Sequence, residues 1–151
     1  MNQTLYLVDN NALVTLRRER ISSVFFLTYC RVTDDVLREA REHPDEALLT
    51  RNRYELTPTV LEQIRSVMKT IEVGDTSLVD LYANKGAADP GLIASARDAI
   101  AVDEGRLFAD TWVIVTNDRA VEATAAEHCI PTLRPADLAA LIDASSNPGL
   151  A

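Results

Sequence analysis

The chain has 151 residues, of which 47% are hydrophobic and 25% charged, and its net charge is −8. This composition suits one globular domain, without the run of roughly 20 apolar residues that crosses a membrane and without a signal peptide's basic flank and apolar core. The acidity argues against broad attraction to nucleic acid or anionic membranes, although divalent cations can reverse the sign within a site. We expect a cytoplasmic protein with one domain over residues 1–144 and a flexible tail over residues 145–151.

The first third of the chain alternates between strand and helix patterns. Residues 4–8 predict a buried strand, and residues 11–20 predict a helix that ends in a basic turn. Residues 23–29 are aromatic and apolar and predict a second strand. Residues 33–43 begin with a Thr/Asp cap and predict a helix that ends before a proline. Residues 45–54 predict a short helix or an irregular segment.

The middle of the chain carries three helix patterns. Residues 57–71 begin with a Thr-Pro cap and form an amphipathic helix. Its predicted buried stripe consists of Val60, Ile64, Val67, Met68 and Ile71. Residues 75–86 predict a short helix. Residues 89–105 predict a longer one, with Asp89 as the cap and proline at the first helical position.

The last third returns to alternation. Residues 111–116 are β-branched, apolar and almost uncharged, which predicts a central strand, and residues 118–129 predict a helix. Residues 130–133 predict an edge strand, because their proline cannot donate to a ladder, and residues 135–144 predict a last helix. The alternation predicts an α/β fold: a three-layer α/β/α sandwich with a mostly parallel sheet. The order of the strands is not indicated.

The cysteines and histidines do not form a metal-binding pattern. Cys30 and Cys129 are far apart in the chain and have no paired neighbour, which indicates neither a disulfide framework nor a zinc site. His128 precedes Cys129, but no further spaced ligands follow.

Four acidic residues fall at related positions of the predicted sheet. Asp9 follows the first strand and Asp118 follows the strand at residues 111–116. Because the carboxyl ends of parallel strands share one edge, these two carboxylates point into one crevice if their strands are neighbours. Asp89, at a helix N-terminus, can be held near that edge, and Glu39 can reach inward from the helix after the second strand.

Carboxylates brought together in this way need compensation. Two unit charges about 4 Å apart repel by about 4 kcal/mol at an effective dielectric constant of about 20. Protonation or a cation relieves that repulsion, and oxygen-only ligands favour Mg²⁺ or Mn²⁺ over zinc. Such ions activate water and stabilise phosphate charge during in-line displacement. Thr116 and Asn11 could orient the carboxylates or a bound water.

Each acid also has an ordinary structural interpretation. Asp89 precedes a proline and Asp118 precedes a helix, so both could be N-caps, and Glu39 alone fits a solvated helix face. Asp9 is the least easily explained as a cap, because either of the two asparagines after it could cap the helix equally well. No single acid decides between the two interpretations.

The order of the motifs around the four acids favours the functional interpretation over the structural one. Its motifs are "DNNALV" with Asp9, "VTDDVLREA" with Glu39, "AADPGLIASAR" with Asp89, "VIVTNDRAV" with Thr116 and Asp118, and the closing "AAEHCIPTLRPADLAALI". With these motifs the chain resembles the PIN-domain family of metal-dependent nucleases, best known as the VapC-type toxins of bacterial toxin–antitoxin pairs. The resemblance runs nearly end to end, but the segment at residues 42–76 carries no recognised signature.

The resemblance implies hydrolysis of phosphodiester bonds, most often in RNA, by water activated on Mg²⁺ or Mn²⁺. Asp9, Asp89 and Asp118 would bind the metal, and Glu39 would bind a metal or its water shell. Asn11 would position Asp9. The family also implies a homodimer and, for a toxin, an antitoxin-type protein inhibitor.

The basic residues give weaker expectations. Arg17, Arg18 and Arg20 form the only dense basic cluster and could meet substrate phosphate or an acidic partner. Favourable charge at a helix C-terminus explains them more simply. Arg97, on the helix after Asp89, is a weaker phosphate contact.

Other functional classes fit the motifs less well. A haloacid-dehalogenase-type phosphatase needs a second aspartate where Asn11 stands, and a receiver domain needs a lysine where the chain offers Arg119. The alternative that stays open is a catalytically silent PIN-fold module that binds RNA or protein. The chain lacks a basic-aromatic stripe, and its complete set of acids favours an enzyme.

Overall fold

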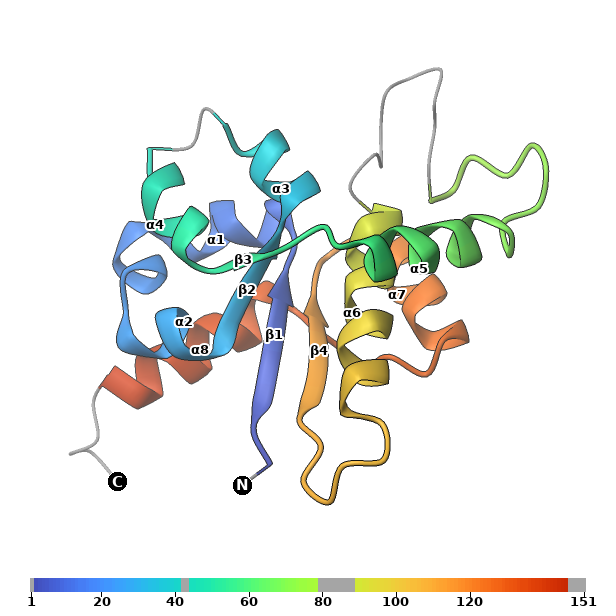
Figure 1. Cartoon of the computed structure of the whole chain (residues 1–151). Helices are drawn as coiled ribbons and strands as arrows, with labels where there is room; N and C mark the ends of the chain where they lie inside the picture. The colour runs from blue at the N-terminus through green and yellow to red at the C-terminus, as the bar shows by residue number, and fades with distance from the viewer. Residues whose placement is uncertain (1, 42–43, 79–88, 147–151) are drawn as a thin grey trace.

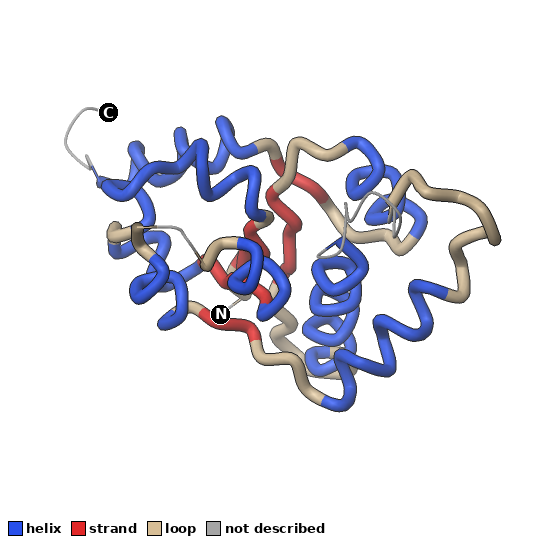
Figure 2. Tube along the Cα trace, turned by 90° about the horizontal axis from the view of Figure 1, so that it is seen from above, coloured by secondary structure: helices blue, strands red, loops and turns tan. Residues whose placement is uncertain are grey.

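The architecture is a parallel sheet between two layers of helices (Figures 1 and 2). The computed structural model describes residues 2–41, 44–78 and 89–146. Its strands are β1 Thr4–Val8, β2 Cys30–Thr33, β3 Arg53–Tyr54, β4 Thr111–Val115 and β5 Thr132–Leu133. Its helices are α1 Asn10–Ile21, α2 Val24–Tyr29, α3 Asp34–Glu39, α4 Glu46–Arg51, α5 Pro58–Met68, α6 Asp89–Asp103, α7 Arg119–Glu127 and α8 Pro135–Ser146. The predicted three-layer α/β/α class is confirmed.

The strand order places β1 and β4 side by side at the centre. The sheet runs β3-β2-β1-β4-β5, and every pair in it is parallel. The register pairs Val8 with Val115, and the Asp9 N–H donates to the Val115 carbonyl at 3.0 Å. The two strands therefore end at the same level, and the residues that follow them begin at one edge of the sheet.

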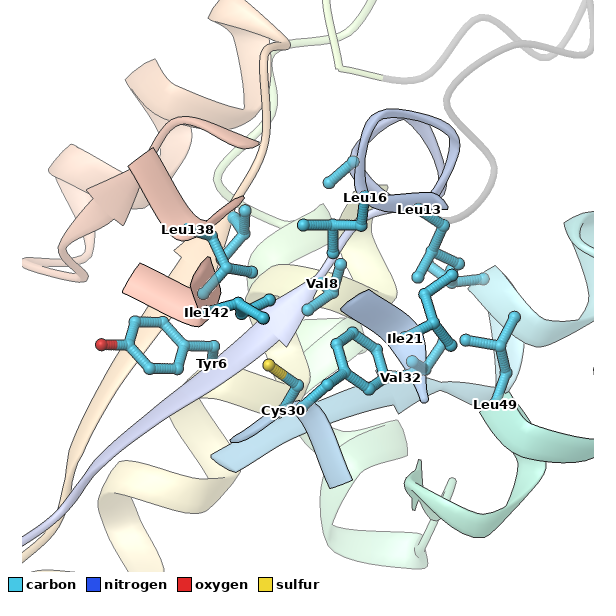
Figure 3. Packing of buried hydrophobic residues seen from close by; sticks show 14 of the residues in the cluster. Tyr6, Val8, Leu13, Leu16, Ile21, Cys30, Val32, Leu49, Leu138 and Ile142 are labelled. Atoms are coloured by element: carbon cyan, nitrogen blue, oxygen red, sulfur yellow. The ribbon is translucent and has the colours of Figure 1, made fainter. Parts of the chain in front are cut away.

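Alternation along β1 supplies both hydrophobic cores. Tyr6 and Val8 face the core formed with α1, α2 and α8, which Figure 3 shows around Leu16, Leu138 and Ile142. Leu7, between them, faces the opposite side, where β4 and helices α5, α6 and α7 complete a second core. Burial on both faces explains why these strands are apolar throughout.

The second strand lies later in the chain than predicted. Residues 23–29 were expected to be a strand, but they form α2, and β2 begins at Cys30. Ser23 starts the helix, because its hydroxyl accepts a hydrogen bond from the Phe26 N–H at 3.2 Å. The prediction of a strand was wrong because it relied on the aromatic content of the segment and overlooked this cap.

The C-terminal end of α2 is stabilised by a side chain from a distant part of the sequence. Asn52 is buried, and its amide nitrogen donates to three carbonyls, those of Phe26 (2.9 Å), Leu27 (3.2 Å) and Cys30 (2.8 Å). The Phe26 carbonyl also accepts from the Cys30 N–H, and the Cys30 carbonyl also accepts from the Arg31 guanidinium. The amide therefore ties three carbonyls together at this helix end and is not their sole donor.

We expect Asn52→Ala to lower the free energy of unfolding by about 2 kcal/mol, because it removes the three hydrogen bonds that the buried amide donates. Urea denaturation measures the change. Thr50→Ala, at an exposed position of α4 two residues before Asn52, is the control and should cost much less. Equal losses for the two variants would contradict the capping role of Asn52.

Other boundaries differ in detail. The predicted helix at residues 33–43 ends at Glu39, and residues 45–54 divide into α4 and β3. Met68 is 40% exposed, so the predicted stripe of α5 was wrong there, whereas Val60 and Val67 are buried.

Two predicted segments fall partly outside the described residues. Of the helix predicted for residues 75–86, residues 75–78 are not helical and the rest lies outside the described residues. Helix α8 extends to Ser146, so the first two residues assigned to a tail are helical, and the remainder is outside the description. Among the described helices, none is long and apolar enough to cross a membrane.

Candidate acidic metal site

Asp9 lies where β1 meets α1. It is buried, with 4% of its surface exposed, and it has the extended backbone of an N-cap residue. One carboxylate oxygen accepts from the Asn10 N–H at 2.6 Å, and the other accepts from the Thr116 hydroxyl at 2.9 Å. Burial raises the pKa of Asp9, these two hydrogen bonds oppose the rise, and the charge of Asp118 adds to it. Asp9 is therefore a cap whose second oxygen is directed to the neighbouring strand.

Thr116 links the ends of the two central strands. Its side chain is fully buried, and its hydroxyl donates to Asp9 while it accepts from the Asp118 N–H at 3.0 Å. One hydroxyl thus fixes the carboxylate after β1 and the backbone after β4. This geometry suits the orienting role expected for Thr116.

Asp118 is the N-cap of α7. Its Oδ1 accepts from the Ala120 N–H at 2.7 Å and from the Val121 N–H at 3.3 Å. Both capping bonds use the same oxygen, so the structural interpretation of Asp118 does not compete with ligation through the other oxygen.

Asp89 is influenced by the charges of the other three acids. It is the first residue within α6, whereas the sequence predicted it as the cap that precedes the helix. Burial raises the pKa of Asp89 to about 7, and the negative charges of Asp9, Asp118 and Glu39 add to the rise. Glu39 itself is exposed at the end of α3. Figure 1 shows α3 and the start of α6 at the end of the sheet where β1 and β4 finish.

These residues fit a hard divalent cation in donor chemistry and charge. Within the described parts of the chain, no three His, Cys, Asp or Glu side chains already form a ligand set. The acids do offer oxygen donors only, from four separate elements. Burial is the main cause of the raised pKa of Asp89, and a cation would relieve the repulsion that adds to it. Mg²⁺ and Mn²⁺ match that donor set better than zinc.

Asn11 is exposed on the first turn of α1. The residue that contacts Asp9 is its direct neighbour, because the Asn10 backbone N–H holds one carboxylate oxygen. Sequence reasoning missed this contact, since a backbone donor carries no residue-type signal.

The basic cluster on α1 has partners within the fold. Arg20 forms a two-point ion pair with Asp143 of α8, at 2.9 and 2.8 Å, and exposed Arg18 lies 3.4 Å from Asp45. Arg17 has φ of 58°, which kinks α1 at this point. These contacts favour the structural interpretation of the cluster for Arg18 and Arg20.

Arg97 lies away from the acids. It is about 12 Å further along α6 than Asp89. There it lines a cavity of about 550 Å³ with Gln63, Asp110 and His128, close to the amino end of β4. Its guanidinium contacts the His128 Nδ1 at 3.4 Å, and burial and this positive charge lower the pKa of His128. The structure therefore does not bring Arg97 to the site with which the sequence grouped it.

The same cavity contains an uncompensated polar group. In the described part of the chain, the Gln63 Oε1 is buried and has no hydrogen-bond partner in the protein. Gln63→Met keeps the side-chain length and removes this acceptor, so we expect about 1 kcal/mol of added stability in urea denaturation. Glu62→Met, at an exposed position of the same helix, is the control. A loss of stability in Gln63→Met would show that the amide has a partner in solution.

Comparisons with known proteins bear on the fold alone. No family model matches the sequence, and no curated protein matches it. Among solved structures, the chain is similar to the PIN domain of T. brucei RRP44, with a TM-score of 0.55 and 13% sequence identity. The match covers 96% of this chain and 85% of the other. The fold is therefore PIN-like.

Proposed function

We propose that the chain is a Mg²⁺- or Mn²⁺-dependent nuclease that hydrolyses phosphodiester bonds, with RNA as its substrate. The observation that carries the proposal is the placement of Asp9 and Asp118 at the neighbouring ends of β1 and β4, linked by the Thr116 hydroxyl. The negative charges of Asp9, Asp118 and Glu39 also add to the raised pKa of Asp89. A PIN-like fold with this acidic edge fits metal-dependent hydrolysis better than a structural role, because clustered carboxylates are otherwise destabilising.

The four acids have different parts in this proposal. Asp9, Asp89 and Asp118 hold the cation. Glu39 is exposed at the C-terminal end of α3, and it binds the cation or its water shell. Thr116 keeps one oxygen of Asp9 in a fixed direction. A bound cation supplies activation of water and stabilisation of charge on the phosphate.

The test is cleavage of labelled single-stranded RNA with Mg²⁺, with Mn²⁺ and with chelator, for the wild type and Asp9→Asn. We expect metal-dependent cleavage that falls by more than about a hundredfold in the variant, since even residues behind metal ligands affect binding or activity tenfold to a hundredfold. Full cleavage by Asp9→Asn would overturn the proposal. Absence of both cleavage and Mn²⁺ binding in the wild type would favour a binding module.

We further propose a toxin role with an antitoxin-type inhibitor and a homodimeric state, on family resemblance alone. Growth arrest on overproduction in a bacterial host, relieved by Asp9→Asn, supports the toxin role, and harmless overproduction contradicts it. Sedimentation of the purified chain tests the dimer.

A further inference from the structure

Helices α3 and α6 meet where the end of the Asp35 side chain lies against the backbone of Gly91. A Cβ atom built on Gly91 would overlap the Oδ2 atom of Asp35 and lie 3.4 Å from its Cγ. The carboxylate therefore occupies the space where any other side chain at position 91 would begin.

The Asp35 carboxylate is held in this place from its other side. Its Oδ1 accepts from the Arg38 guanidinium at 3.2 Å, and only 18% of the side chain is exposed. Gly91 is buried in the first turn of α6. Asp35 is thus mostly buried and ion-paired on one side of the contact, and Gly91 is buried on the other.

The contact is one helical turn from Glu39 on α3 and two residues from Asp89 on α6. Asp35 and Glu39 are four residues apart on α3, which places them on the same face of that helix. Gly91 is in the same turn of α6 as Asp89. A change in the distance between the helices at this contact would therefore also change the separation of Glu39 from Asp89.

We infer that Asp35 is a positioning residue: its carboxylate, seated on Gly91, fixes the separation of Glu39 from Asp89 and so shapes the cation site. The inference rests on the proposed metal-dependent function. Asp35 acts through its shape, as a spacer between two helices, and is not itself a ligand.

Gly91→Ala tests the spacing directly. Alanine favours a helix by about 1 kcal/mol over glycine, so any harm from this substitution comes from the collision with Asp35 and not from the helix itself. Asp35→Ala removes the carboxylate and makes room for the new methyl group. The double variant Asp35→Ala/Gly91→Ala should therefore recover what Gly91→Ala loses.

The measurement is Mn²⁺ affinity by electron paramagnetic resonance, with thermal unfolding of the same samples. We expect Gly91→Ala to bind Mn²⁺ about tenfold more weakly and the double variant to recover most of that loss. Asp35→Asn, which keeps the shape without the charge, should stay within about threefold of the wild type.

The outcomes distinguish a failure of the inference from a failure of the proposed function. If the wild type binds Mn²⁺ and Gly91→Ala binds it equally well, or loses thermal stability alone, the inference is overturned and the nuclease proposal stands. Failure of the double variant to recover affinity also overturns it. If the wild type binds no Mn²⁺, the proposed function fails and the positioning role fails with it.

Discussion

Thr116→Val is expected to lower the free energy of unfolding by about 3 kcal/mol and to weaken Mn²⁺ binding tenfold to a hundredfold. Valine has nearly the shape of threonine, so the packing between β4 and its neighbours is kept. The lost hydroxyl leaves a buried carboxylate oxygen of Asp9 without its donor and the Asp118 N–H without its acceptor. Urea denaturation and Mn²⁺ titration measure the two effects.

Thr116→Ser is the matched control, because it keeps the hydroxyl and removes only a methyl group. We expect it to keep most of the Mn²⁺ affinity and to lose about 1 kcal/mol of stability from the missing methyl. If serine and valine weaken metal binding equally, the hydroxyl does not orient Asp9, and the effect comes from packing.

Asp89→Asn is expected to abolish metal-dependent cleavage and, in the absence of metal, to stabilise the protein near neutral pH. The pKa of Asp89 is raised to about 7 in the folded chain, so between about pH 4 and pH 7 the folded state binds more protons than the unfolded state. The stability of the wild type therefore falls as the pH rises through this window. Asparagine cannot ionise and avoids that loss.

Urea denaturation across the pH range measures this effect for Asp89→Asn and for a control variant. At about pH 8 we expect the variant to exceed the wild type by about 2 kcal/mol, discounted for the partial exposure of Asp89, and the difference to vanish at about pH 4. Asp75→Asn should show the opposite trend, because a hydrogen bond from the Ser77 N–H lowers the pKa of exposed Asp75. A stability difference for Asp89→Asn that does not change with pH would contradict the charge interpretation.

Added Mn²⁺ should reverse the order of stability of the wild type and Asp89→Asn. A ligand that binds the folded state stabilises it in proportion to its affinity, so added Mn²⁺ raises the stability of the wild type and has little effect on Asp89→Asn. Thermal unfolding with and without Mn²⁺ provides this measurement.

Local patterns predicted the parts of the fold that local interactions determine. The apolar runs that became β1 and β4 and the caps at Thr57 and Asp118 are visible in short windows of sequence. Parallel strand ends share an edge, which placed Asp9 and Asp118 together once their strands proved to be neighbours.

The features that the sequence could not indicate depend on contacts between distant segments. The C-terminal end of α2 accepts hydrogen bonds from the amide of Asn52, which lies more than twenty residues later in the chain. The seat of Asp35 on Gly91 joins segments that are further apart still. Arg97 was grouped with the acids by its helix alone, and only the direction of α6 shows that it lies towards the other edge of the sheet.

The two outermost strands have a consequence for self-association. β3 and β5 are only two residues long, so each side of the sheet offers very few free backbone groups to another strand. Short outer strands are a common protection against edge-to-edge aggregation. Within the described ranges, a second copy of this chain therefore finds little sheet to extend, and we expect any stable pairing to use helix surfaces.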